Sequence, residues 1–188
     1  MKGAGCAGIN FGVDSANYNM LKTLGRDFMP SDLRYAALLC RKCGIICMFD
    51  LLLGGPGETR KTIRETIEFV KDSNPDRVGV AMGIRVYPGT PFGEMIKKGG
   101  FWNKLYGKPK PDADFFAPTF YLEDDFSSCV ENLIAGDERF FFPCASNRSY
   151  NYNDNKVLIE AIKQGYRGAF WDIMRRLKKS PRERELNL

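Results

Sequence analysis

Long apolar runs are missing from the sequence, and so are the marks of a sorting signal. No stretch approaches the roughly 18 apolar residues that a bilayer-spanning helix needs. The opening residues, KGAGCAGIN, lack the succession of charged, apolar and small residues that forms a signal peptide. Internal repeats and low-complexity tracts are absent as well. We therefore expect a cytoplasmic protein with no membrane partner.

Charge of one sign is also scarce. The 188 residues include 28 Lys and Arg and 23 Asp and Glu, which gives a net charge of +5, and much of the excess lies in residues 175–184. Because the rest of the chain is close to balanced, the composition gives no clear sign of nucleic-acid binding. With 44% hydrophobic residues, the chain can bury one good core and an appendage, but not two large domains.

The cysteines do not form an obvious metal site. Cys40, Cys43 and Cys47 are close in sequence, and their spacing raises the alternative of metal or iron–sulfur ligands. Residues 32–45 have the apolar spacing of a helix that Gly44 would end, so Cys47 falls in the next strand. Small cysteines packed in a core explain this pattern better. We therefore assign no metal ligand in this chain.

Strand and helix patterns alternate up to about residue 99. Strands are expected over residues 7–15, 45–54 and 77–88. Helices are expected in a stretch that ends at Cys43, over residues 59–72, and in a short stretch that ends at Lys98. This alternation predicts an α/β fold with parallel strands and right-handed crossovers. After residue 99 the chain becomes rich in aromatic residues and proline, and a last helix is expected over residues 155–179. We predict a first domain over residues 1–99 and a mainly α extension over residues 100–188, a candidate substrate or lid region.

The stretch LLLGGPGETRKT, residues 51–62, invites comparison with a phosphate loop. When the motif GxxxxGK[ST] is aligned on its Lys-Thr pair, Gly55 fits, but Arg60 replaces the glycine that lets backbone amides wrap around phosphates. Glu58 would add a carboxylate to a nest meant for a polyanion, and Pro56 removes an amide donor. A P-loop-like nucleotide-binding protein is therefore only a remote alternative.

Three successive strands are each followed by a polar or glycine-rich turn, over residues 12–15, 54–58 and 84–90. Ligands of parallel sheets bind beyond the carboxyl ends of the strands. The turns together therefore predict one ligand-binding edge, although each turn alone is more typical of an ordinary strand-to-helix connection.

In this order the motifs GVDS, DLLLGGPGET and IRVYPGT resemble the C-terminal half of the radical S-adenosylmethionine (radical SAM) domain, in the branch that includes cobalamin-dependent enzymes. The resemblance covers about residues 3–99 and implies a partial (β/α) barrel. Asp14 and Ser15 stand where the family usually has Glu-Ser, near the ribose and amino acid part of S-adenosylmethionine. Leu52 is expected beneath the adenine. The implied cofactor-binding residues are Asp14, Ser15, Leu52, Gly54, Gly55, Pro56, Gly57, Glu58, Arg85, Val86 and Tyr87.

The same resemblance has consequences for cofactors. The family holds a 4Fe-4S cluster with the spacing Cys-x-x-x-Cys-x-x-Cys after its first strand, and this spacing does not occur in the sequence. The cluster ligands, and any cobalamin domain, are therefore expected in a missing upstream part, with this chain inactive alone. The parent would be an oxidoreductase or transferase, and its substrate is not identified. The alternative is a half-barrel that binds a ligand or a protein without catalysis.

Half of a barrel would also leave two open sheet edges and an apolar inner face. We expect the chain to associate with itself or with the missing half of the barrel, or else to cover the open face with its C-terminal aromatic residues. These residues are Phe101, Trp102, Phe115, Phe116, Phe120, Tyr121 and the run 140–142.

Overall fold

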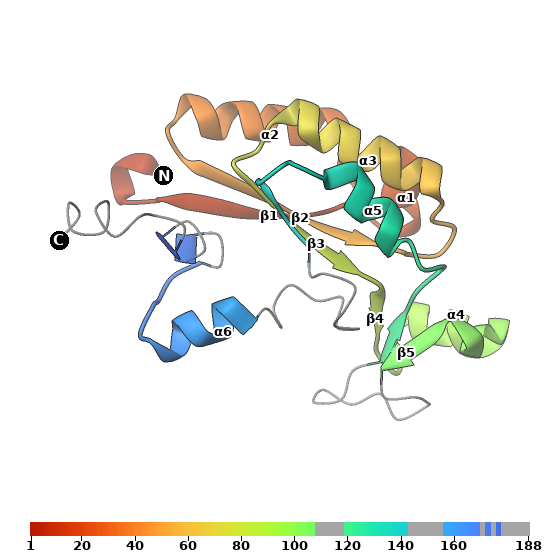
Figure 1. The fold of residues 1–188 in the computed structure, drawn as a ribbon. Helices are drawn as coiled ribbons and strands as arrows, with labels where there is room; N and C mark the ends of the chain where they lie inside the picture. The colour runs from red at the N-terminus through yellow and green to blue at the C-terminus, as the bar shows by residue number, and fades with distance from the viewer. Residues whose placement is uncertain (108–118, 143–155, 170–171, 174–175, 178–188) are drawn as a thin grey trace.

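The computed structural model describes residues 1–107, 119–142, 156–169, 172–173 and 176–177. Its larger layer is a sheet in the strand order β1-β2-β3-β7 (Figure 1). The strands are β1 (Gly8–Asp14), β2 (Ile46–Leu53), β3 (Arg77–Met82) and β7 (Phe140–Phe141). All neighbouring strands run parallel, which confirms the predicted α/β fold with a parallel sheet.

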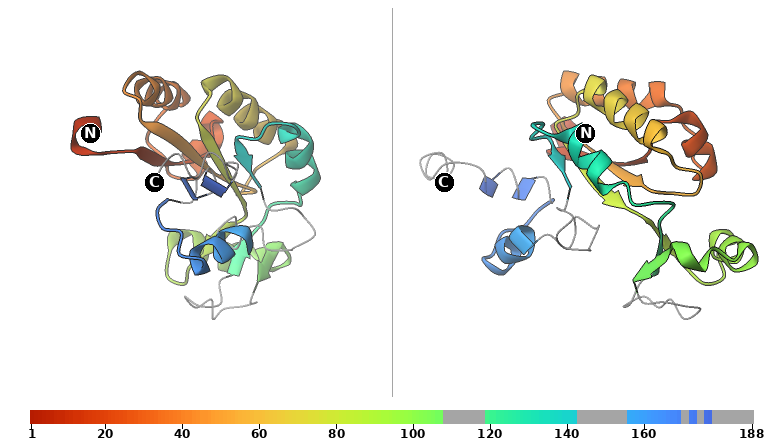
Figure 2. Two further views of the ribbon diagram at one scale, coloured as in Figure 1. Left: turned by 60° about the vertical axis from the view of Figure 1, so that its left-hand side comes forward. Right: turned by 45° about the vertical axis from the view of Figure 1, so that its right-hand side comes forward.

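Helices cover one face of this sheet (Figures 1 and 2). They are α1 (Tyr18–Thr23), α2 (Pro30–Lys42), α3 (Arg60–Ser73) and α5 (Ser127–Ile134). Every second residue of β2 joins the core cluster, namely Cys47, Phe49, Leu51 and Leu53. On α3 the buried partners have the spacing of one helix face, namely Ile63, Ile67 and Val70. Because side chains alternate along a strand, Met48, Asp50 and Leu52 lie on the other face of the sheet.

The ends of α3 show why this helix forms where the sequence predicts it. The Thr59 hydroxyl accepts a hydrogen bond from the Thr62 N–H (3.2 Å), which satisfies one of the free donors at the start of the helix. At the other end Asn74 takes a left-handed conformation (φ 52°) just before Pro75, which cannot continue a helix.

A small antiparallel sheet adjoins the parallel one. It has the order β4-β6-β5 and consists of β4 (Ile84–Val86), β6 (Thr119–Tyr121) and β5 (Leu105–Gly107). Around it lie α4 (Pro91–Gly99) and a 3-10 turn, η2 (Phe101–Lys104); another such turn, η1 (Lys2–Ala4), begins the chain. Tyr121 is 2% exposed and makes edge-to-face ring contacts with Phe92 and Phe101. None of these three rings belongs to the core cluster of the parallel sheet.

The strand expected over residues 77–88 is not continuous, which corrects the sequence prediction. β3 ends at Met82, and β4 begins at Ile84 in the other sheet. Gly83 between them has a φ of 83°, a conformation that favours glycine. The Tyr106 hydroxyl donates a hydrogen bond to the Met82 carbonyl (2.7 Å) and occupies the space of a side chain at Gly83. The chain therefore leaves the parallel sheet at this glycine.

Segments beyond residue 99 join both sheets. β7 adds to the outer edge of β3, and Phe140 enters the core cluster of the parallel sheet. Three short strands, β5, β6 and β7, accompany helices α5 and α6 (Lys156–Lys163) in the described part of this extension. Among the described residues, β1 has a strand on one side only. The domain division at residue 99 stays a prediction.

The expected last helix is interrupted after Lys163, and residues 172–173 and 176–177 are helical again. The sequence predicts a helix over residues 155–179, whereas α6 spans Lys156–Lys163 and ends before Gly165, which has a φ of 94°. Beyond it, Ile173 packs with Ala161 in a small cluster of its own. Phe115 and Phe116, two of the aromatic residues expected to cover the sheet, lie outside the described residues.

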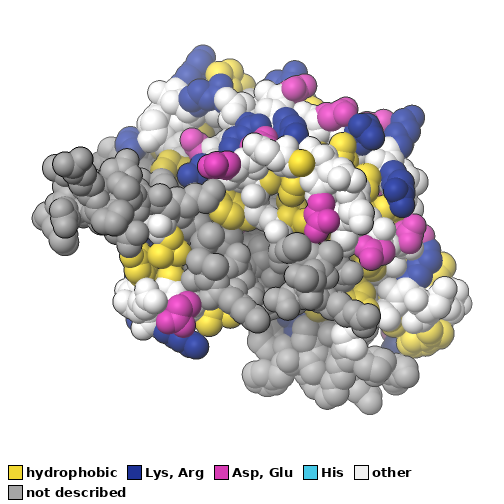
Figure 3. Space-filling view, in the orientation of Figure 1, with side chains coloured by type: hydrophobic (Ala, Val, Ile, Leu, Met, Phe, Trp, Pro, Cys, Tyr) yellow, Lys and Arg dark blue, Asp and Glu magenta, His cyan; other side chains and the backbone are white. Residues whose placement is uncertain are grey.

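Charged side chains of both signs are scattered over the helical layer at the top of Figure 3, without a large patch of one sign. Within the part of the chain that the structure describes, we find no helix that is long and apolar enough to span a membrane.

Candidate functional site

The turns that follow β1, β2 and β3 meet at one edge of the parallel sheet. The strands run in the same direction, so their carboxyl ends share this edge. The packing around Gly55, in the turn after β2, shows how close the turns come. A side chain at Gly55 would lie 2.8 Å from the Ile84 side chain and 3.5 Å from that of Leu24. The segments that follow β1 and β3 therefore both pack against the glycine-rich turn after β2.

Neither buried glycine of this turn has room for a side chain. A Cβ on Gly54 would lie 2.3 Å from Cδ1 of Leu122, and the φ of 86° at this residue also favours glycine. Gly57 has a positive φ (77°) as well, but it is exposed and has open space around it. The backbone of this turn therefore requires glycine at residues 54 and 55, and the turn lies at the edge where parallel sheets bind ligands.

The turn after β1 presents an ion pair. Asp14 has a φ of 59°, an uncommon conformation that Asp tolerates better than most residues. Its Oδ2 accepts a hydrogen bond from Arg26 Nε (2.6 Å) and lies 2.5 Å from Arg26 Nη2. The Asp14 side chain is 13% exposed and that of Arg26 is 41% exposed. The guanidinium thus fixes the carboxylate and still faces solvent with part of its surface.

Ser15 lies on the other side of this turn. It is fully buried, and its hydroxyl is 2.9 Å from the Thr66 hydroxyl of α3. It also accepts a hydrogen bond from the Asn17 N–H (3.1 Å). In this structure Ser15 therefore ties the turn to α3, and its hydroxyl does not face the ligand-binding edge.

Glu58 likewise turns inward, and it holds its own loop together. It is 3% exposed, and its carboxylate accepts hydrogen bonds from the Gly54 N–H (3.2 Å) and the Thr62 hydroxyl (2.7 Å). Burial raises the pKa of this carboxyl above its usual value, although these hydrogen bonds act in the opposite direction. We infer that Glu58 shapes the turn rather than contacting a ligand.

The same contacts exclude a phosphate loop at this position. The Glu58 carboxylate, which would repel a phosphate, is buried within the turn and accepts a hydrogen bond from the Gly54 N–H. Lys61 points outward on α3, where its side chain is 84% exposed and lies 3.9 Å from Glu65. The remote alternative drawn from the Lys-Thr pair therefore has no geometric support.

The remaining predicted residues fall into two groups. Leu52 lies on the face of β2 opposite the helices and is partly exposed. Arg85 and Val86 belong to β4 and thus to the antiparallel sheet, not to the end of a parallel strand as predicted. Tyr87 follows them, 43% exposed, with the Arg85 guanidinium 4.9 Å from the centre of its ring. Pro56 is half-buried within the glycine-rich turn.

Sequence reasoning missed several polar side chains at this edge and on the sheet face that leads to it. Arg26 lies 12 residues after Asp14, and its positive charge was the available signal. Asn10 donates a hydrogen bond to Asp50 (2.6 Å) across β1 and β2, on the face opposite the helices. Glu123, which binds the glycine-rich turn, gave no signal at all because it lies 66 residues beyond Gly57.

Cys40, Cys43 and Cys47 are not arranged as metal ligands. Cys40 and Cys47 are 5% and 1% exposed in the core, and burial raises the pKa of both thiols. Cys43, at the end of α2, is exposed instead. No three His, Cys, Asp or Glu side chains among the described residues group together as a metal site would require.

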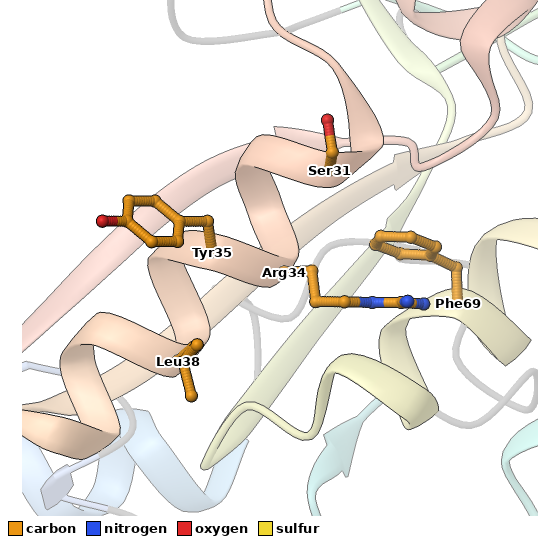
Figure 4. A pocket seen from close by; sticks show the side chains of 5 residues that line it. All are labelled: Ser31, Arg34, Tyr35, Leu38 and Phe69. Atoms are coloured by element: carbon orange, nitrogen blue, oxygen red, sulfur yellow. The ribbon is translucent and has the colours of Figure 1, made fainter.

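A groove of about 390 Å³ opens on the outside of the molecule between α2 and α3 (Figure 4). Ser31, Arg34, Tyr35, Leu38 and Phe69 line it. The Arg34 guanidinium lies 4.9 Å from the centre of the Phe69 ring. The groove lies on the helical side of the molecule, whereas the convergent turns lie at the carboxyl ends of the strands. We therefore do not include the groove in the candidate site.

Known proteins resemble this chain in sequence over part of its length. It is 32% identical over 93 residues to the tryptophan 2-C-methyltransferase of Streptomyces laurentii, covering 45% of this chain and 15% of that protein. It is 31% identical over 90 residues to an uncharacterized methyltransferase of Pyrococcus horikoshii, covering 48% and 19%. Over 180 residues, 92% of this chain and 31% of the relative, it is 22% identical to the anaerobic magnesium-protoporphyrin IX monomethyl ester cyclase of Rubrivivax gelatinosus. No protein-family model matches the chain.

A solved structure extends the likeness to the fold. The radical SAM methyltransferase TsrM of Kitasatospora setae, with tryptophan and a SAM analogue bound, matches 94% of this chain with a TM-score of 0.71 and 23% identity. The match covers 43% of the TsrM chain, so this chain spans less than half the length of its relatives. The solved structure shows that this chain shares part of the fold of a radical SAM methyltransferase, and the sequence likenesses agree with the predicted resemblance to that family.

Proposed function

We propose that this chain provides part of the S-adenosylmethionine site of a radical SAM enzyme, an oxidoreductase or transferase. The observation that carries the proposal is the convergence of three strand-end turns on Gly55, with Ile84 and Leu24 packed around it. The similarity in sequence to two methyltransferases supports it. The substrate is not specified by the described residues.

The geometry suits a ligand that carries a carboxylate, an ammonium group and a purine. Arg26 offers guanidinium N–H groups to a carboxylate, and Asp14 offers an acceptor beside it. The turn over residues 54–57 is open to a ligand at Gly57, which is exposed and has no atom within 4 Å of its side-chain position. Leu52 provides an apolar surface on the neighbouring strand. When bound, S-adenosylmethionine supplies a sulfonium carbon whose bond to sulfur is broken in the reaction.

The iron–sulfur cluster does not fit the described residues. Cys40 and Cys47, whose thiols contact each other, are buried, and burial raises the pKa of both thiols. We propose that cluster ligands, and any cobalamin, are bound by polypeptide outside these 188 residues, and that this chain does not start radical chemistry alone. Calorimetric titration and anaerobic reconstitution of a larger parent protein would test this division.

Binding of S-adenosylmethionine to the chain, measured by isothermal titration calorimetry, tests the central proposal. Arg26→Ala should weaken binding about tenfold or more, because a charge-assisted hydrogen bond is lost. Arg64→Ala is the matched control, since Arg64 is an exposed arginine on the outer face of α3. No binding by the wild-type chain, or equal losses in both variants, would contradict the proposal.

The outer edge of β1 supports a second, structural part of the proposal. Among the described residues this edge has no neighbouring strand, so its backbone groups are available for pairing. We propose that it pairs with the rest of the barrel, or with a second copy when that is absent. Analytical ultracentrifugation over a range of concentrations should show self-association of the chain, and a monomer at all concentrations would contradict it.

A further inference from the structure

A carboxylate from beyond the antiparallel sheet binds the glycine-rich turn. Glu123 follows β6, and its Oε2 accepts a hydrogen bond from the Gly57 N–H (2.9 Å). Its own N–H donates to the Gly54 carbonyl (2.9 Å). Both ends of the turn are therefore attached to a single residue that is 66 positions away from Gly57 in sequence.

Two further groups hold this carboxylate in place. The Tyr121 hydroxyl donates to Oε2 of Glu123 (2.6 Å), and Lys104 forms an ion pair with Oε1. The side chains of Lys104 and Glu123 are 25% and 22% exposed, so water screens the pair only in part. Burial opposes ionisation of Glu123, but the hydrogen bonds from Lys104, Tyr121 and Gly57 outweigh it and lower the pKa of the carboxyl. Glu123 is thus a charged acceptor at neutral pH.

The position of the Gly57 amide depends on this contact. Gly57 is exposed, has a φ of 77° and has no atom within 4 Å of its side-chain position, so the packing around it is loose. Glu58 fixes only the Gly54 end of the turn, through the Gly54 N–H. The exposed end therefore has Glu123 as its observed side-chain partner.

We infer that Glu123 is a positioning residue for S-adenosylmethionine binding, which it serves by holding Gly57 while Lys104 and Tyr121 hold Glu123. This inference rests on the proposed function. It assigns to the segment after β4 a role in shaping the cofactor turn, in addition to its role in the antiparallel sheet. The cofactor itself need not touch Glu123.

Two measurements on the same variants test the inference. The first is hydrogen exchange of the Gly57 amide by NMR, which needs no ligand, and the second is S-adenosylmethionine affinity by calorimetry. Glu123→Ala should speed Gly57 exchange and weaken affinity, each about tenfold, because it removes a hydrogen bond to a charged acceptor. Glu123→Gln keeps one acceptor oxygen and should restore part of both. Circular dichroism would verify that each variant is folded.

Asp124→Asn is the matched control, because it neutralises the next carboxylate in the chain, which is exposed. It should leave Gly57 exchange and affinity unchanged. In the wild type, affinity should also fall when acid protonates Glu123, and this pH dependence should be absent from Glu123→Gln.

The outcomes separate the inference from the proposed function. If wild type and Glu123→Ala bind S-adenosylmethionine equally well, the inference is overturned and the proposed function stands. If the wild type does not bind while its Gly57 amide is protected, the proposed function fails, and the cofactor role of Glu123 fails with it. Weaker binding by Glu123→Ala with rapid Gly57 exchange supports both.

Discussion

The parallel sheet and the antiparallel sheet meet at Gly83, yet they are stabilised in different ways. The parallel sheet is covered by helices, and its cluster includes many fully buried side chains from β1, β2, β3 and α3. The antiparallel sheet has three strands of three residues each, held by ring contacts and by polar contacts to the neighbouring turn. Apolar burial therefore supports the scaffold, whereas directional contacts support the part that shapes the candidate site.

The largest expected difference is between a phenylalanine in each sheet. Phe49 is fully buried in the large cluster, so Phe49→Ala should lower the free energy of unfolding by about 3–5 kcal/mol. Phe120 is partly exposed and stacks on Tyr106 with a centroid distance of 5.4 Å, so Phe120→Ala should cost only about 1–2 kcal/mol. Urea unfolding followed by circular dichroism measures both. Equal losses would mean that the antiparallel sheet is as much a part of the core as the parallel one.

The junction between the sheets gives the next largest effect. Gly83→Ala places a Cβ 2.1 Å from the Tyr106 hydroxyl at a φ of 83°. We expect a loss of about 2–3 kcal/mol, from left-handed strain together with the displaced hydrogen bond to Met82. Gly89→Ala is the control, since Gly89 has a φ of 75° and open space, and it should cost about 1–2 kcal/mol from strain alone. Similar losses in thermal or urea unfolding would show that Tyr106 does not fix the junction.

The break at Gly83 also shows where prediction from sequence stops. Strands and helices up to α3 follow from the local spacing of apolar residues, which does not depend on distant partners. Residues 77–88 have the same apolar pattern on both sides of Gly83, so nothing local distinguishes β3 from β4. The pairing of β4 with β6 joins residues 84–86 to residues 119–121, and local spacing contains no information on it.

The candidate site was predicted in part for the same reason. The turns were identified because glycines and polar residues follow apolar runs. The directions of the side chains were not predicted. Ser15 and Glu58 turn inward and form hydrogen bonds with α3 and with the glycine-rich turn. Their contacts depend on packing between elements, as does that of Glu123 with Gly57.

A smaller effect distinguishes the two glutamates that hold the glycine-rich turn. Glu58 follows β2 of the parallel sheet, and Glu123 follows β6 of the antiparallel sheet. The pKa of Glu58 is raised, so its contribution to stability is present below its unfolded value near 4.5 and is lost as the pH rises through the folded pKa. The pKa of Glu123 is lowered, so its contribution is present above the unfolded value and is lost as the pH falls through the folded pKa. The two residues therefore influence the pH dependence of unfolding in opposite directions.

Neutral variants make this difference measurable. As the pH rises from about 4 to about 8, Glu58→Gln should become more stable relative to wild type. As the pH rises from acid values, Glu123→Gln should become less stable relative to wild type. Urea unfolding at a series of pH values gives both slopes. Slopes of the same sign would mean that one carboxylate is not in the environment that the structure shows.

The smallest effect is expected on the outer face of α3, the helix that connects β2 to β3. Arg64 and Glu68 lie 3.7 Å apart, four residues from each other, with side chains 61% and 59% exposed. Because solvent screens such pairs, Arg64→Ala should change the free energy of unfolding by less than about 0.5 kcal/mol, and added salt should reduce the change further. A loss above about 1 kcal/mol would exceed what an exposed pair contributes. Such a loss would mean that the outer face of α3 packs against other residues. Both faces of this helix, and not only the one toward the sheet, would then contribute to stability.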